Sequence, residues 1–175
     1  MTLILSRLAS PLDELLIVHD GAALHAVEFA DHAARMARLL ARHHAGALRD
    51  GALPDGVAAA FAAYFGGAGD ALDGLPVAAA GSDFQRRVWA ALRTIPAGQT
   101  WSYAQLAEAI GQPGAARAVG LANGANPVGI VVPCHRVIGA NGTLTGYAGG
   151  LARKHWLLAH EGAMPSETAD FFLTR

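Results

Sequence analysis

A chain of 175 residues with 53% hydrophobic and 15% charged residues can build one large or two small globular domains, which excludes a generally disordered chain. It has no run of about 18 strongly apolar residues and no signal-peptide pattern at its start, so we expect no membrane association. A single cysteine excludes an internal disulfide and favours a reducing, cytoplasmic location.

The net charge of −1 hides an uneven distribution along the chain. Residues 1–80 carry five Arg against nine acidic residues, whereas residues 81–175 carry seven Arg and one Lys against five acidic residues. The second half is therefore basic, and it also holds the single cysteine, Cys134. This pattern indicates an anionic partner for the second half.

The first half of the chain predicts a small antiparallel sheet with helices. Alternating apolar residues, turn residues and helical spacing define its elements. They are a strand within residues 2–8, a hairpin of residues 15–19 and 24–29 around Asp20-Gly21, a helix over residues 32–43 capped by Asp31, and a helix over residues 57–65. The adjacent His43 and His44 cannot share one helix face, so we expect a solvent-facing pair rather than a zinc site.

A Gly- and Asp-rich stretch, residues 66–74, is typical of a linker. We therefore expect two domains, residues 1–78 and 79–175. The second is predicted to be mostly helical, with helices over residues 84–92, 103–110, 115–123 and 151–160, the first two capped by Ser82 and Ser102. The tail segment Phe171-Phe172-Leu173 could dock on the core.

The helices over residues 103–110 and 115–123 are joined by a Gly- and Pro-containing turn, which has the form of a helix-turn-helix. The second of them carries Arg117 among small residues. A face of Ala116, Ala118 and Gly120 could approach the minor groove of DNA, with Arg117 as a probe. Plain packing between helices is an equally good interpretation of the same residues.

Cys134 lies within Pro-Cys-His-Arg-Val, residues 133–137. An apolar run over residues 128–132 precedes this motif and turn residues follow it, so a buried segment delivers a lone thiol to a turn beside an imidazole. The thiolate is the nucleophilic form of cysteine, and a nearby imidazole or cation lowers the thiol pKa. The local residues leave two interpretations open, a nucleophile or a small buried hydrophobic side chain.

Taken together, the motifs in residues 84–161 closely resemble those of the O6-alkylguanine-DNA alkyltransferases, also called methylated-DNA–protein-cysteine methyltransferases. The segments that carry the resemblance are Phe84–Trp89, Thr100–Tyr103, Arg117–Gly120, Asn126-Pro127, Pro133–Gly139, Gly146–Leu151 and Leu157–Glu161. The first half resembles the family more loosely, through Ser10-Pro11-Leu12 and the hairpin after it.

The resemblance implies an α+β protein. An N-terminal ribonuclease-H-like antiparallel sheet domain with helices would precede a mostly helical, winged-helix-like domain. It also implies single-turnover repair, in which Cys134 takes an alkyl group from guanine O6 in DNA, and from O4-methylthymine as well, and keeps it. The family's reaction needs no cofactor. Some relatives bind zinc through N-terminal cysteines, which this chain lacks, so we expect no metal.

The same resemblance assigns roles around the thiol. His135 would be the base that deprotonates Cys134 through water, and Glu161 would orient His135. Asn126 would brace the turn that holds the cysteine. Tyr103 would donate a hydrogen bond to guanine N3 and crowd the rotating 3′ phosphate.

Further residues would bind the damaged base. The Val137 carbonyl would accept from the exocyclic amine of guanine, the Ala148 amide would donate to O6, and Tyr147 would line the pocket together with Gly149. Some relatives have serine where Ala148 stands, so tolerance of bulky alkyl groups could differ while activity survives.

The target atom is hidden inside duplex DNA, so the nucleotide must be flipped out of the stack. The resemblance makes Arg117 the finger that fills the gap, and makes Ala116, Ala118 and Gly120 a minor-groove face. We expect a monomer on double-stranded DNA, with binding that depends on salt more than on sequence.

Two classes of protein other than an enzyme share some of these features. One is a non-catalytic protein that binds alkylguanine lesions, but relatives of that kind replace the cysteine. The other is a winged-helix transcription regulator, which would need a more polar recognition helix than residues 115–124.

Overall fold

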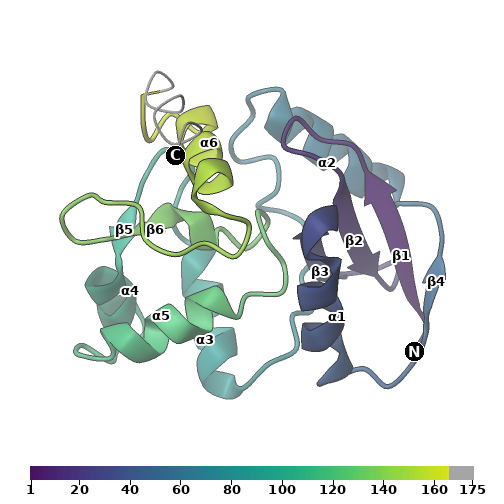
Figure 1. The fold of residues 1–175 in the computed structure, drawn as a ribbon, viewed down its shortest axis with the longest axis horizontal. Helices are drawn as coiled ribbons and strands as arrows, with labels where there is room; N and C mark the ends of the chain where they lie inside the picture. The colour runs from purple at the N-terminus through teal and green to yellow at the C-terminus, as the bar shows by residue number, and fades with distance from the viewer. Residues whose placement is uncertain (166–175) are drawn as a thin grey trace. The chain divides into compact units, whose positions relative to one another are not determined.

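The computed structural model describes residues 1–165 and combines helices with a small sheet, which confirms the α+β class (Figure 1). The predicted docking of Phe171-Phe172-Leu173 lies outside the described residues. Contacts divide the chain into two compact units, one of residues 1–82 with 127–131 and the other of residues 83–126 with the chain from Val132 onward. The boundary expected between residues 78 and 79 lies slightly before this division, and a single boundary does not capture the segment 127–131.

The first unit is built on a four-stranded sheet with the strand order β3-β2-β1-β4. Its strands are β1 (Leu3–Leu8), β2 (Leu15–His19), β3 (Leu24–Phe29) and β4 (Leu48–Asp50). β2 pairs antiparallel with both β1 and β3, which confirms the predicted hairpin, whereas β4 runs parallel to β1. The sequence did not predict β4 because three partly exposed residues leave no alternating pattern to detect.

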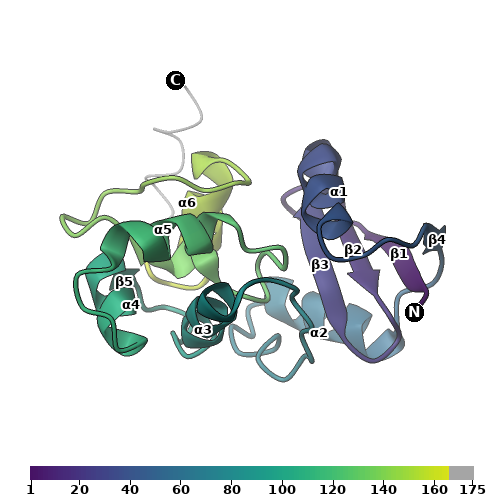
Figure 2. The same ribbon diagram turned by 90° about the horizontal axis from the view of Figure 1, so that it is seen from below.

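Helix α1 (Ala33–Ala41) packs against the sheet beside β3 (Figure 2). Met36 and Leu40 of this helix join Leu16 and Val18 of β2 in one hydrophobic core cluster. The predicted cap Asp31 is wrong. The chain first makes a short 3-10 helix, η1 (Ala30–His32), so α1 begins after His32 without a side-chain cap.

The outer edge of β3 is covered by two other segments of the first unit. Val27 donates its amide to the carbonyl of Pro127 and accepts from the amide of Gly129, both at 3.0 Å. Leu24 pairs in the same way with Pro76 and Ala78. These bonds satisfy an edge that would otherwise expose unpaired backbone groups, and they explain why residues 127–131 belong to this unit.

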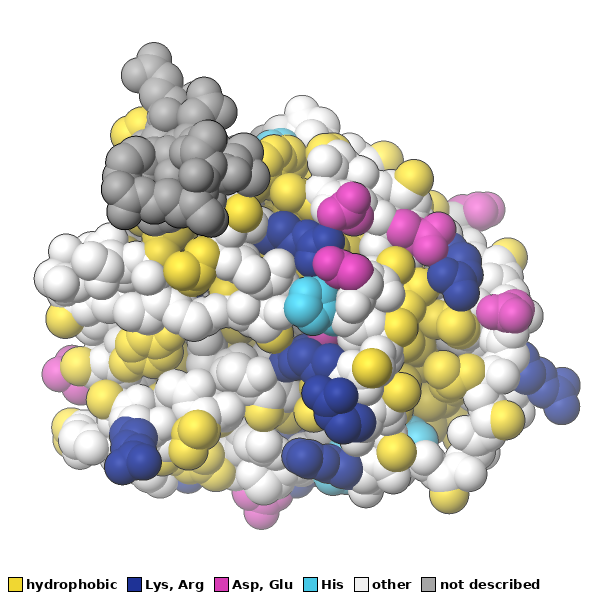
Figure 3. Space-filling model, in the orientation of Figure 1, with side chains coloured by type: hydrophobic (Ala, Val, Ile, Leu, Met, Phe, Trp, Pro, Cys, Tyr) yellow, Lys and Arg dark blue, Asp and Glu magenta, His cyan; other side chains and the backbone are white. Residues whose placement is uncertain are grey.

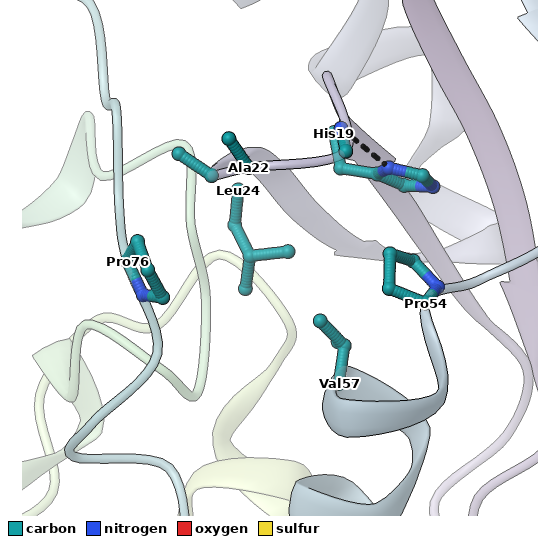
Figure 4. Close-up of a pocket in the computed structure, with 8 residues that line it drawn as sticks. His19, Ala22, Leu24, Pro54, Val57 and Pro76 are labelled. Atoms are coloured by element: carbon teal, nitrogen blue, oxygen red, sulfur yellow. Dashed lines mark hydrogen bonds between the residues drawn. The ribbon is translucent and has the colours of Figure 1, made fainter.

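The opposite face of the sheet carries Leu15 and Ile17, both fully buried. Helix α2 (Asp55–Phe65) begins beside this face, where its Val57 and Leu24 of β3 line one small cavity (Figure 4). The cavity also includes His19, whose Nδ1 accepts from the Gly21 amide at 3.1 Å. Its volume of about 20 Å³ is enough for about one water, so it does not indicate a ligand site.

The second unit is mainly helical. Its helices are α3 (Asp83–Leu92), α4 (Tyr103–Ala109), α5 (Ala116–Gly124) and α6 (Leu151–His160). Two short strands, β5 (Trp101–Ser102) and β6 (Val137–Ile138), pair in parallel. These two-residue strands escaped prediction because they are shorter than any sequence pattern.

A local signal sets the start of α4 as predicted. Ser102 accepts from the amide of Gln105 at 3.1 Å, and the Gln105 side chain accepts from the Ser102 amide at 2.7 Å. This capping box confirms Ser102 as the cap of α4. Helix α5 contacts α3 and α4, and Trp89 of α3 donates its indole N–H to the carbonyl of Ala122 at 2.8 Å. In the described part of the chain, no helix is both long and apolar enough to cross a bilayer.

Candidate active site

Cys134 begins a short 3-10 helix, η2 (Cys134–Arg136), and is 7% exposed. Its amide donates to the carbonyl of Val132 at 2.8 Å, which closes a tight turn. The buried side chain of Asn126 donates to the same carbonyl at 2.8 Å. Two hydrogen bonds to the Val132 carbonyl, one from the backbone and one from a side chain, therefore hold the turn that carries the thiol.

The apolar run before the cysteine is buried as expected, and it forms tight turns. Ile130 has φ of 68°, in the left-handed region that a β-branched residue rarely adopts. Next to it, the Val131 amide donates to the carbonyl of Gly129 at 2.8 Å. A Cβ on Gly129 would lie 3.2 Å from the carbonyl oxygen of Val27, so glycine permits this close approach. Strain held by surrounding structure is typical of functional segments.

His135 and Glu161 meet from distant parts of the second unit. The Nε2 of His135 lies 2.8 Å from Oε1 of Glu161, and both side chains are fully buried. Arg136 donates two hydrogen bonds to the same carboxylate, from Nε to Oε2 at 3.0 Å and from one Nη to Oε1 at 2.9 Å. Its other Nη donates to the carbonyl of Ile95 at 2.6 Å. The carboxylate thus contacts both a cation and an imidazole, which share its Oε1.

These contacts set the charge states of the pair. Burial by itself raises the pKa of Glu161, but His135 and Arg136 outweigh burial and lower the pKa from 4.5 to about 2. Burial lowers the pKa of His135, and the charges of Arg136 and Lys154 act in the same direction, against Glu161. Near neutral pH, a neutral imidazole therefore donates its Nε2–H to an ionised carboxylate.

This tautomer leaves the other ring nitrogen of His135 as the basic one. Within residues 1–165, the buried Nδ1 has no hydrogen-bond partner. A lone pair on Nδ1, beside the residue that carries the thiol, is the feature needed to accept a proton from that thiol.

Lys154 of α6 is a further charged group that the sequence analysis missed. It is fully buried, and its Nζ donates to the carbonyls of Val137 at 2.6 Å and Thr145 at 2.7 Å. Burial lowers its pKa from 10.5 to about 8, although the charge of Cys134 acts in the opposite direction. Helical spacing could have predicted its burial, because Lys154 lies three and four residues before the buried Leu157 and Leu158 and therefore shares their helix face.

The β5–β6 pairing positions Tyr103. β6 directly follows the cysteine turn and pairs with β5, and Tyr103 is the first residue after β5. The Tyr103 hydroxyl lies 3.0 Å from the hydroxyl of Thr145, and a Cβ on Gly120 would lie 3.6 Å from its ring. Tyr103 therefore joins α5 to the loop before α6.

The residues proposed to bind the base follow the cysteine turn in the chain, in β6 and in the loop before α6. The rings of Tyr147 and His135 meet edge-on, with centroids 6.5 Å apart. Val137 is fully buried, Ala148 is half-buried, and Gly149 is buried and accepts from Arg153 at 3.3 Å through its carbonyl.

The residues predicted to meet DNA lie on α5. Arg117 and Ala118 are exposed, and Ala116 and Gly120 are half-buried. They do not belong to the His135–Glu161 cluster. Among residues 1–165, no group of three or more His, Cys, Asp or Glu is arranged to hold a metal ion.

A buried thiol followed by a histidine, with a carboxylate and cations fixing the charge of that histidine, is typical of proteins that react through an activated cysteine. The comparisons with known proteins agree with this class. The family described as "6-O-methylguanine DNA methyltransferase, DNA binding domain" matches residues 83–163.

The methylated-DNA–protein-cysteine methyltransferase of Shigella flexneri is 52% identical over 166 residues, which cover 93% of this chain and 97% of that protein. The protein of the same name from Mycolicibacterium paratuberculosis is 74% identical over 81 residues, which cover 46% of this chain and 49% of that protein. A solved structure of Mycobacterium tuberculosis OGT in complex with DNA matches with a TM-score of 0.76 at 39% identity, covering 96% of this chain and 99% of that one. This chain belongs to the methylated-DNA–protein-cysteine methyltransferase family.

Proposed function

We propose that this protein repairs alkylated DNA by direct reversal, moving a methyl or larger alkyl group from guanine O6 to Cys134. The observation that carries the proposal is the buried Cys134-His135 turn with His135 held against Glu161, in a chain that belongs to this family. O4-methylthymine is a second substrate of the same chemical kind.

The first step is removal of the thiol proton. His135 takes it at Nδ1 through a bridging water while its Nε2–H stays on Glu161, and the imidazolium is stabilised by that carboxylate. The positive charge of Lys154 favours the thiolate of Cys134 in the same way.

In the second step, the thiolate attacks the alkyl carbon. The new sulfur–carbon bond forms as the carbon–O6 bond breaks. The electron pair of the broken bond stays on O6 and is shared with the guanine ring. The Tyr103 hydroxyl donates to N3, and the Ala148 amide donates to O6, so both offset the charge that develops on the leaving base. The thioether is stable, so each molecule reacts once.

The pocket for the base is formed by the cysteine turn and the loop before α6. The Val137 carbonyl already accepts from Lys154, and its second lone pair accepts from the exocyclic amine of guanine. Tyr147, Ala148 and Gly149 line the other side. Alanine at position 148 offers no hydroxyl, which alters the range of alkyl groups that fit.

DNA reaches the pocket with the nucleotide flipped out. Helix α5 approaches the minor groove through Ala116, Ala118 and Gly120, and Arg117 fills the gap left by the flipped base. We assign the helical unit as a winged-helix-like domain and the sheet unit as a ribonuclease-H-like domain. The protein acts as a cytoplasmic monomer.

The alternative of a non-catalytic lesion-binding protein is not favoured, because Cys134 is present with a base beside it and the curated relatives are named as methyltransferases. No described residue cluster suggests a metal, and the transfer itself needs no cofactor.

The test is the intact mass of the protein after mixing with duplex DNA that contains O6-methylguanine. We expect a gain of one methyl group, located on the Cys134 peptide. Cys134→Ser should show no gain while it binds the same DNA with unchanged affinity. Tight binding without a mass change in the parent protein would support the lesion-binding alternative, and methylation of the Cys134→Ser variant would refute the assignment of the acceptor.

A further inference from the structure

Leu121 is a large apolar side chain that the helical unit leaves exposed. Its exposed fraction is 73%, although it lies in the interior of α5. Among residues 1–165, the other exposed large hydrophobic side chains are Met1 and Leu151, the first residues of the chain and of α6. A single exposed leucine is ordinary on a protein surface, so its surroundings decide whether it has a role.

Leu121 belongs to one continuous face of α5. The exposed residues of this helix are Arg117, Ala118, Leu121 and Gly124, whereas Val119, Ala122 and Asn123 are buried on the other side. Leu121 stands four residues after Arg117, so the two side chains are neighbours on the helix surface. The rest of the face consists of small residues, and a Cβ on Gly124 would meet nothing within 4 Å.

The chemistry of this face suits DNA. Helix α5 carries one cation and no acidic residue, and it lies within residues 83–163, which match the family's DNA-binding domain. In Figure 3, the lower left of the molecule, where Figure 1 places α5, shows hydrophobic and uncharged groups interspersed with dark-blue cations. Small residues allow close approach to a groove, and proteins that bind the minor groove often insert leucine between base steps.

We propose that Leu121 is a second DNA-contacting residue, which wedges against the base edges one helical turn beyond Arg117 and keeps the neighbouring step unstacked while the damaged nucleotide is outside the duplex. This inference rests on the proposed function and names a contact that the reaction on duplex DNA requires. Arg117 fills the gap with a charged side chain, whereas Leu121 supplies an apolar surface for the adjacent bases.

The experiment compares Leu121→Ala, Leu121→Gln and Leu121→Met with the parent protein. The single-turnover rate of Cys134 alkylation is measured with duplex DNA containing O6-methylguanine and with free O6-benzylguanine. A 2-aminopurine placed beside the lesion reports unstacking by its fluorescence, in the Cys134→Ser background so that no transfer occurs. Free benzylguanine reacts without base flipping, so it reports the folded state and the chemistry of the thiol.

We expect the alanine and glutamine variants to react with duplex DNA about tenfold more slowly and to lose most of the fluorescence gain. Their reaction with free benzylguanine should stay within about twofold of the parent, and the methionine variant should behave like the parent. Unchanged duplex rates in both the alanine and glutamine variants would overturn the inference, as would equal slowing with the free base. Absence of alkylation in the parent protein would instead refute the proposed function.

Discussion

The ammonium group of Lys154 donates a hydrogen bond of 2.6 Å to the backbone carbonyl of Val137. This bond ties α6 to β6, directly after the turn that carries Cys134. Lys154 is fully buried and interacts electrostatically with Cys134. The same side chain therefore holds β6 in place and affects the charge of the thiol.

Replacing Lys154 should therefore change the pH dependence of the thiol. In Lys154→Met, the loss of a buried positive charge that interacts with Cys134 should disfavour the thiolate. The rate of alkylation by iodoacetamide, measured from pH 6 to 10, should shift to higher pH. Since the pKa of Lys154 is about 8, parent and variant should converge above that pH, where the parent lysine is neutral.

The control is Arg87→Met, which removes a positive charge from the exposed surface of α3. It should leave the profile unchanged. A profile in Lys154→Met that matches the parent at every pH would show that the lysine serves only to hold the two carbonyls.

Glu161→Gln should destabilise the protein by about 3 kcal/mol at pH 7, because the pKa of Glu161 falls from 4.5 to about 2 on folding and the variant leaves Arg136 without its carboxylate. A lowered carboxyl pKa stabilises the fold above the unfolded value and loses this effect as the pH falls. The difference in free energy of unfolding, measured with urea, should therefore shrink below pH 4.5 toward pH 2.

Glu108→Gln offers a comparison at an exposed carboxylate in the same unit, and its stability should change by less than about 0.5 kcal/mol. If the deficit of Glu161→Gln stays constant between pH 7 and 3, ionisation of the carboxylate is not its source.

Arg117→Ala should slow repair of duplex DNA at least about tenfold, because in the proposed mechanism the exposed guanidinium fills the gap in the stack. Reaction with free O6-benzylguanine should stay within about twofold of the parent. Rates are measured under single-turnover conditions. As a control, Arg49→Ala removes an exposed charge from β4 and should leave both rates unchanged. Equal slowing of both reactions in Arg117→Ala would exclude the finger role.

Asn126→Asp should cost about 1–3 kcal/mol of stability and slow the reaction of the thiol, since a carboxylate cannot donate to the Val132 carbonyl and the site is buried. Urea unfolding and the iodoacetamide rate at pH 7 measure the two effects. Asn141→Asp, in an exposed loop, should change neither. A stable Asn126→Asp variant with a normal rate would show that the turn keeps its conformation without the hydrogen bond from Asn126.

Short-range features of this protein followed directly from its sequence. The hairpin around Asp20-Gly21 and the capping box of Ser102 with Gln105 depend on residues a few positions apart, so their patterns are visible in the chain. The motif around Cys134 and its resemblance to a known family pointed to the thiol, to His135 and to Glu161. Asp31 shows the limit of such signals, since a single 3-10 turn moved the start of α1 past the expected cap.

The tertiary structure alone decided which distant groups share a charge or a hydrogen bond. Arg136 meets Glu161 across 25 positions, and Lys154 meets Val137 across 17, although neither contact has a local pattern. The pairing of residues 127–131 with β3 likewise depends on where the chain returns. Local hydrogen bonds are fixed by nearby residues, whereas burial and its effect on pKa arise only when separate elements pack around the same group.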